Sequence, residues 1–70
     1  MNVYINKRTG GYSGGLAVVA ARSTAEAQGI LAQNMEGSEY YYDPHTWQKL
    51  DNVEANVSEP QLLAENGYTE

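Results

Sequence analysis

The chain contains no cysteine and no phenylalanine, and it lacks a long apolar run. Without cysteine, a disulfide framework and a thiolate zinc site are both excluded, and nothing indicates a redox compartment. The longest uninterrupted apolar run, residues 16–21, is six residues long. A helix that spans a bilayer needs about 20 such residues, so we do not expect a transmembrane protein.

Basic residues are also scarce. Four Lys and Arg stand against nine Asp and Glu, which gives a formal net charge of −5. Nucleic acids and anionic membranes are bound through Lys and Arg, and only Lys7 and Arg8 are adjacent here. We therefore expect neither direct nucleic-acid binding nor a membrane partner. The acidic balance indicates solubility, with an acidic surface that imitates nucleic acid as the alternative.

The length of 70 residues predicts a single small domain over residues 1–70, because domains typically span about 50–250 residues. Internal repeats and a linker are absent, so the sequence offers no domain boundary. The first seven residues do not form a basic stretch followed by an apolar one, as a secretory signal would. These features predict a cytoplasmic protein.

A β-hairpin is expected at the start of the chain. In residues 2–7, Val3 and Ile5 alternate with Asn2, Tyr4 and Asn6, which is typical of a half-buried strand. Four glycines follow within residues 9–15, and residues 15–21 then form an apolar run short enough for a buried strand. Glycine supplies the positive backbone angles that a turn or bulge between the strands needs.

A helix is expected from Ser23 to about Met35. Ser23 and Glu26 match a capping box, in which the serine hydroxyl accepts from the N–H of Glu26 and the glutamate accepts from the N–H of Ser23. Gly29 falls opposite the apolar side, and Gly37 suits the C-terminal cap. The predicted apolar stripe comprises Ala27, Ile30, Leu31, Asn34 and Met35.

The second half of the chain leaves alternatives open. Residues 39–42 have the composition of a strand that Asp43 and Pro44 would end. Residues 44–51 form either a turn or one or two helical turns capped by Asp43. Residues 52–57 read as extended, and residues 61–65 as a closing strand that stops near Asn66 and Gly67.

The sequence therefore predicts an α+β fold, with a small and mostly antiparallel sheet packed against a single helix. The sheet would consist of the N-terminal hairpin and one or two later strands. The connection through the helix leaves room for one parallel pair of strands.

The residues that carry chemistry do not form a catalytic pattern. The glycines at 10–15 match neither a phosphate-binding loop nor a dinucleotide fingerprint. His45 is the single histidine, and no spacing links it to a nucleophile or to a set of metal ligands. We expect no cofactor, no metal and no enzymatic activity. A small hydrolase, with two carboxylates beside Trp47 as a stacking platform for a sugar, is the distant alternative.

An aromatic cluster is the candidate binding site. Tyr40, Tyr41 and Tyr42 precede Trp47, and such residues are enriched where proteins bind one another. The alternative is that two of these rings fill the core in place of the missing phenylalanine. Tyr12, in the glycine-rich loop, is a further candidate contact.

The favoured function is a protein–protein interaction module that uses an open sheet face or the tyrosine cluster. An acidic inhibitor at the nucleic-acid site of a host enzyme is the alternative. The large aliphatic residues are few, so added burial through a weak homodimer is also expected, at a strand edge or the tyrosine face.

Two segments carry a resemblance. Residues 11–16 and residues 59–65 resemble short proteins of no known function from gut bacteria, their mobile elements and their phages. The resemblance implies a small stand-alone cytoplasmic protein that is accessory to a phage or a mobile element. It implies no activity, cofactor or catalytic residue.

The predicted helix can be tested by two substitutions. Ser23→Ala should lower the free energy of unfolding by about 1 kcal/mol because it removes the N-terminal cap. Leu31→Ala should lower it by about 2–5 kcal/mol if Leu31 is a core residue. Denaturant melts measure both values, and a change below about 0.5 kcal/mol for Leu31→Ala would show that the register is wrong.

Overall fold

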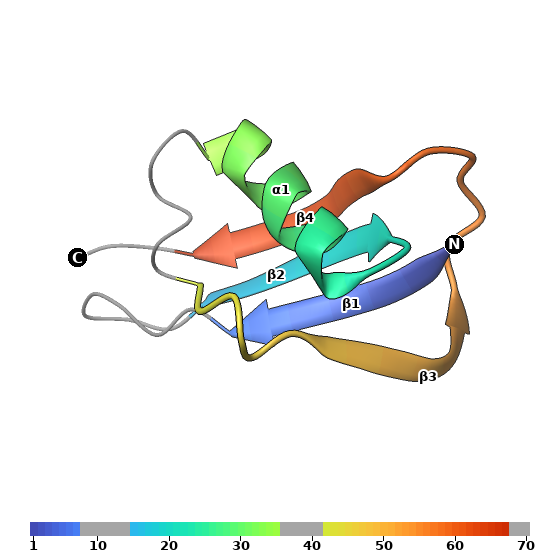
Figure 1. Ribbon diagram of the computed structural model, residues 1–70, viewed down its shortest axis with the longest axis horizontal. Helices are drawn as coiled ribbons and strands as arrows, with labels where there is room; N and C mark the ends of the chain where they lie inside the picture. Colours follow the sequence, from blue (N-terminus) through green and yellow to red (C-terminus); the bar gives the residue numbers. More distant parts are fainter. Residues whose placement is uncertain (8–14, 36–41, 68–70) are drawn as a thin grey trace.

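The fold is an antiparallel sheet with one helix across it (Figure 1). The computed structural model describes residues 1–7, 15–35 and 42–67. The strand order is β3-β1-β2-β4, and each neighbouring pair is antiparallel. The α+β prediction is thus confirmed, and no parallel pair forms among the strands of these ranges. The elements are β1 (Asn2–Lys7), β2 (Gly15–Ala21), α1 (Thr24–Met35), β3 (Gln48–Glu54) and β4 (Gln61–Gly67).

The predicted hairpin forms the centre of the sheet. β1 and β2 have the bounds that the sequence pattern indicates, and they pair in register from Asn2 opposite Ala21 to Lys7 opposite Leu16. The residues between them, including Tyr12, lie outside the described part of the chain. Because β1 and β2 are both central, each pairs with a strand along both of its edges.

The N-terminus of α1 confirms Ser23 as the cap and corrects the predicted capping box. The Ser23 hydroxyl accepts a hydrogen bond from the N–H of Glu26 at 3.1 Å. The Glu26 carboxylate does not reach back to Ser23; its Oε1 accepts from the N–H of Arg22 at 2.7 Å. The guanidinium of Arg22 lies 3.4 Å from the other carboxylate oxygen. Glu26 therefore binds Arg22, the residue before Ser23, and not Ser23 itself.

The inner side of α1 is narrower than the predicted stripe. Ala27 and Leu31 are fully buried, and Ile30 packs against the same core while half-buried. Asn34 is exposed, and its side-chain amide donates to the carbonyl of Ile30 at 2.8 Å, so it faces away from the sheet. The predicted C-terminal cap at Gly37 lies outside the described residues.

The segment before β3 is a turn, and the helical alternative for it is wrong. The Asp43 carboxylate accepts from the N–H of His45 at 2.8 Å, and its carbonyl accepts from the N–H of Thr46 at 3.2 Å. These two bonds close the chain at residues 44–45 and leave residue 48 free to pair with β1. The predicted extended segment at 52–57 is therefore shifted to Gln48–Glu54.

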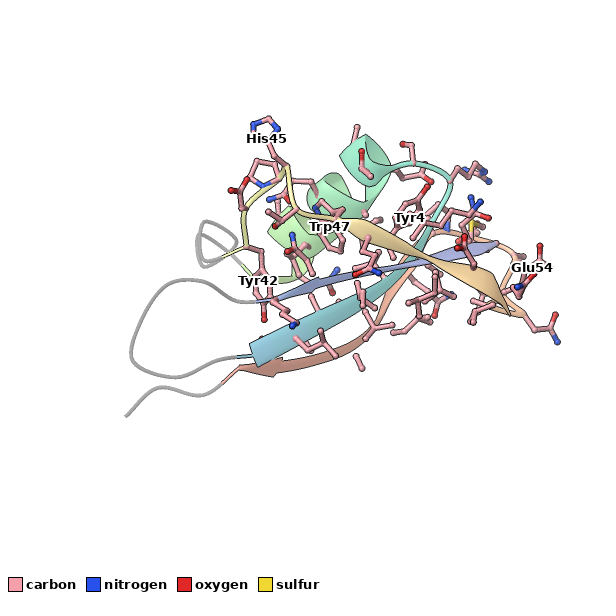
Figure 2. All side chains as sticks on the ribbon, turned by 90° about the horizontal axis from the view of Figure 1, so that it is seen from below. Tyr4, Tyr42, His45, Trp47 and Glu54 are labelled. Atoms are coloured by element: carbon pink, nitrogen blue, oxygen red, sulfur yellow. The ribbon has the colours of Figure 1, made fainter. Side chains whose placement is uncertain are left out.

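The helix alone does not cover the sheet. α1 packs mainly against β2 and β4, because a helix about 10 Å wide spans roughly two strands spaced about 4.8 Å apart. Residues 42–47 lie beside α1 on the same face of the sheet, next to β1 (Figures 1 and 2). They cover the part of the sheet above β1 that the helix does not reach.

A buried amide holds this second cover in place. Asn6 is 2% exposed, and its Nδ2 donates to the carbonyl of Asp43 at 2.8 Å. Its Oδ1 accepts from the hydroxyl of Thr46 at 2.8 Å. Both polar atoms of the amide are thus satisfied, which offsets the cost of burying them.

The exposed side of α1 offers a test of the helix. A Cβ added at Gly29 would meet nothing within 4 Å, so Gly29→Ala introduces no clash. We expect it to raise the free energy of unfolding by about 0.5–1 kcal/mol, because alanine loses less backbone entropy than glycine on entering a helix. Urea unfolding measures the change, and a destabilised variant would contradict the exposed position of this residue.

Candidate interaction surface

The face of the sheet that carries α1 is the core of the molecule. Tyr4, Val19 and Ala21 form one buried cluster with Ala27 of the helix. Ala17, Leu31 and Tyr42 form a second. Trp47 and Leu62 are half-buried and pack against both clusters, so they join the two into one layer.

Tyr42 belongs to this layer. Its side chain is fully buried, and its hydroxyl donates to the Glu65 carboxylate at 2.7 Å. A ring in this position fills core volume and exposes no area to a partner. Of the two interpretations of the tyrosine cluster, the position of Tyr42 matches the one in which tyrosine replaces phenylalanine in the core.

Trp47 lies between the sheet and the helix (Figure 2). Its indole N–H donates to the side-chain oxygen of Gln28 at 2.7 Å, which ties residues 42–47 to α1. The other three predicted contact residues, Tyr12, Tyr40 and Tyr41, lie outside the described ranges. The structure therefore brings Tyr42 and Trp47 into one layer, in which Tyr42 is fully buried and Trp47 half-buried.

The opposite face of the two central strands is aliphatic. Side chains alternate along a strand, so the neighbours of the core residues in β1 and β2 point away from the helix. Register confirms the alignment, because Val3 lies opposite Ala20 and Ile5 opposite Val18. The outward residues of these strands are the aliphatic Val3, Ile5, Leu16, Val18 and Ala20, with Lys7 at the end of β1.

A bulge adds two more aliphatic side chains from β4. Leu62 packs into the core, and Glu65 also faces the helix side, where it binds Tyr42. In a regular strand, residues three apart point to opposite faces, so Leu62 and Glu65 can share a face only if the strand contains an extra residue. The β2–β4 register shifts at this point, between Val18 and Val19. Leu63 and Ala64 therefore both lie on the side away from α1.

We call these seven residues the open face: Val3, Ile5, Leu16, Val18, Ala20, Leu63 and Ala64. One end is shielded within the chain, since Val3 and Ala20 are 5% and 0% exposed. The other end is not, since Leu16 and Leu63 are 39% and 40% exposed. The exposed part, which we call the apolar patch, consists of Ile5, Leu16, Val18, Leu63 and Ala64.

A signal for this surface was present in the sequence. A strand with one face in water alternates polar and apolar residues along its sequence, whereas a strand covered on both faces is apolar throughout. Residues 16–21 are apolar at every position, yet one helix covers one side of the sheet. The contribution of β4 had no such signal, because it depends on a bulge that only the pairing with β2 reveals.

The polar side chains offer little chemistry. His45 is exposed on the turn, on the far side of the core layer from the open face (Figure 2). Within the described ranges, no three His, Asp or Glu side chains come close enough to hold a metal ion. Nor does any helix in those ranges have the length and hydropathy needed to cross a bilayer.

No protein-family model matches the chain, and no curated protein or solved structure matches it. The open face is therefore identified by its geometry alone.

The buried position of Tyr42 can be tested by removing its hydroxyl. Tyr42→Phe keeps the ring but loses the bond to Glu65, and hydrogen bonds to charged groups contribute about 1.5–3 kcal/mol. We expect the free energy of unfolding to fall by about that amount in urea melts. Glu65→Gln should cost less, because the amide oxygen still accepts from the phenol. Equal stability of Tyr42→Phe and the unchanged chain would show that the bond does not form.

Proposed function

We propose that this chain is a protein–protein interaction module without catalytic activity, and that it docks through the apolar patch of the open face. The observation that supports the proposal is that every outward position of β2 from 16 to 20 is aliphatic. A sheet face built for water would carry polar side chains at these positions.

The energetics favour docking at this surface. Complete burial of an exposed leucine contributes about 1.5–3 kcal/mol, so burying the remaining 40% of Leu63 contributes roughly 0.6–1.2 kcal/mol. Leu16 is exposed to nearly the same extent and contributes a similar amount. Ile5 and Val18, which are half-buried, add to this total.

The absence of a reactive constellation among the described residues supports a binding role over catalysis. A general base needs a partner within hydrogen-bond reach, and the described bonds of His45 run through its backbone. The carboxylate of Glu65 accepts a hydrogen bond from the phenol of Tyr42. Neither bond places an acid or a base beside a nucleophile.

The proposal predicts which substitution abolishes capture of protein partners. The tagged chain is used to capture proteins from lysate of its source cell, beside the variants Leu63→Asp and Val53→Asp. Val53 is the control because it is 44% exposed and lies at the end of β3 that pairs with Asn2, away from the patch residues at the other end of the sheet. We expect Leu63→Asp to weaken capture by tenfold or more and Val53→Asp to leave it unchanged, since a buried, unpaired carboxylate is costly. Equal capture by all three chains would contradict the proposal.

A further inference from the structure

We infer that the partner which covers the apolar patch is a second copy of this chain, packed against the first sheet face to sheet face. The inference rests on the proposed function, because it names the occupant of the same surface. It follows from how charge is distributed over the molecule and from the size of the patch.

The charge distribution favours contact at the patch. Two copies with a net charge of −5 each repel one another over most approaches. Among the described residues, the patch contains no carboxylate. The charged side chain aligned with it is that of Lys7, which follows Ile5 by two residues on the same face and lies opposite Leu16.

The described carboxylates lie elsewhere. Glu65 faces the core, and Glu26 lies on the exposed N-terminal turn of α1. Asp51 and Glu54 belong to β3, and Glu54 is at the end of β1 opposite to Lys7 (Figure 2). Asp43 belongs to the turn on the helix side of the sheet, where its carbonyl binds Asn6. Glu59 lines a hollow beside Glu26 and Ile30 of α1. The patch is thus the part of the described surface where two copies meet with the least repulsion. A different acidic protein could bind here only if it also had an aliphatic patch free of carboxylates. A second copy of this chain has such a patch, because it is the same molecule.

Neutral polar residues flank the open face, as expected at the rim of an interface. Gln48 pairs with Ile5 on the β3 side, and Gln61 pairs with Ala20 on the β4 side. Neither brings a charge to the contact. Two sheets that pack in this way lie about 10 Å apart, with their strands within about 30° of one another.

The size of the patch predicts a reversible dimer. Three strands spaced about 4.8 Å apart and about four residues of each strand give a footprint of roughly 14 Å by 13 Å. A standard interface buries about 800 Å² on each partner, which is several times larger than this footprint. We therefore expect association that changes with protein concentration, and not an obligate dimer.

Sedimentation equilibrium over about 10 µM to 1 mM chain measures the association. The apparent mass should rise from 7.7 kDa toward twice that value. Salt should strengthen the dimer, because it screens repulsion between two acidic copies while leaving aliphatic contact intact. Dissociation on addition of salt would contradict the inference.

Two pairs of matched variants locate the contact. Leu63→Asp should weaken dimerisation by tenfold or more, whereas Val53→Asp should leave it unchanged. Lys7→Glu should weaken it as well, since it puts a carboxylate at the patch. Lys49→Glu makes the same change in net charge. Lys49 pairs with Tyr4 and so lies on the opposite face of the sheet. This variant should weaken dimerisation less than Lys7→Glu does.

Three outcomes would overturn the inference. A dimer indifferent to Leu63→Asp and Lys7→Glu forms through another surface, such as the edge of β4. Equal effects of Lys7→Glu and Lys49→Glu show that net charge, and not its position, controls association. A single 7.7 kDa species at all concentrations removes the second copy as partner. In that last case, fluorescence of anilinonaphthalene sulfonate separates the two proposals: binding that Leu63→Asp abolishes keeps the docking function, and no binding removes both.

Discussion

The buried amide of Asn6 is the interaction on which the arrangement of the core depends. One helix covers about half the width of a four-stranded sheet, so the space above β1 must be filled by another segment. Asn6 fills that space by holding Asp43 and Thr46, and the turn then delivers Trp47 to the core. A polar side chain of the central strand thus decides where an aromatic one packs.

This arrangement explains why the aromatic residues lie where they do. The chain has no phenylalanine, and buried Tyr and Trp need a partner for their polar atoms. Tyr42 finds Glu65 of β4, and Trp47 finds Gln28 of α1. Both bonds connect the covering segment to a different element, so the aromatic rings tie the layer together as well as filling it. The aliphatic residues that alternate with these core positions, such as Ile5 and Val18, face the other side of the sheet.

Local signals account for the part of the fold that the sequence predicts. The alternation in residues 2–7, the cap at Ser23 and the apolar run from Leu16 each involve neighbours in the chain, and the hairpin and helix follow from them. The placement of the Asp43 turn over β1 does not, because it depends on bonds to Asn6 that span about 40 residues. The same holds for the site, since Tyr42 is buried against Ala17 and Leu31, and the bulge at Leu63 arises only when β4 pairs with β2.

The strand order has a consequence for how the chain folds during synthesis. The two central strands come from the first 21 residues, whereas both outer strands come from residues 48–67. The hairpin can form as soon as it leaves the ribosome, but β1 and β2 each keep an unpaired edge until the second half of the chain arrives. During that interval two unpaired strand edges and the apolar side chains of both faces meet water at once. Rapid completion of translation, or a chaperone that binds the emerging hairpin, would shorten the exposure.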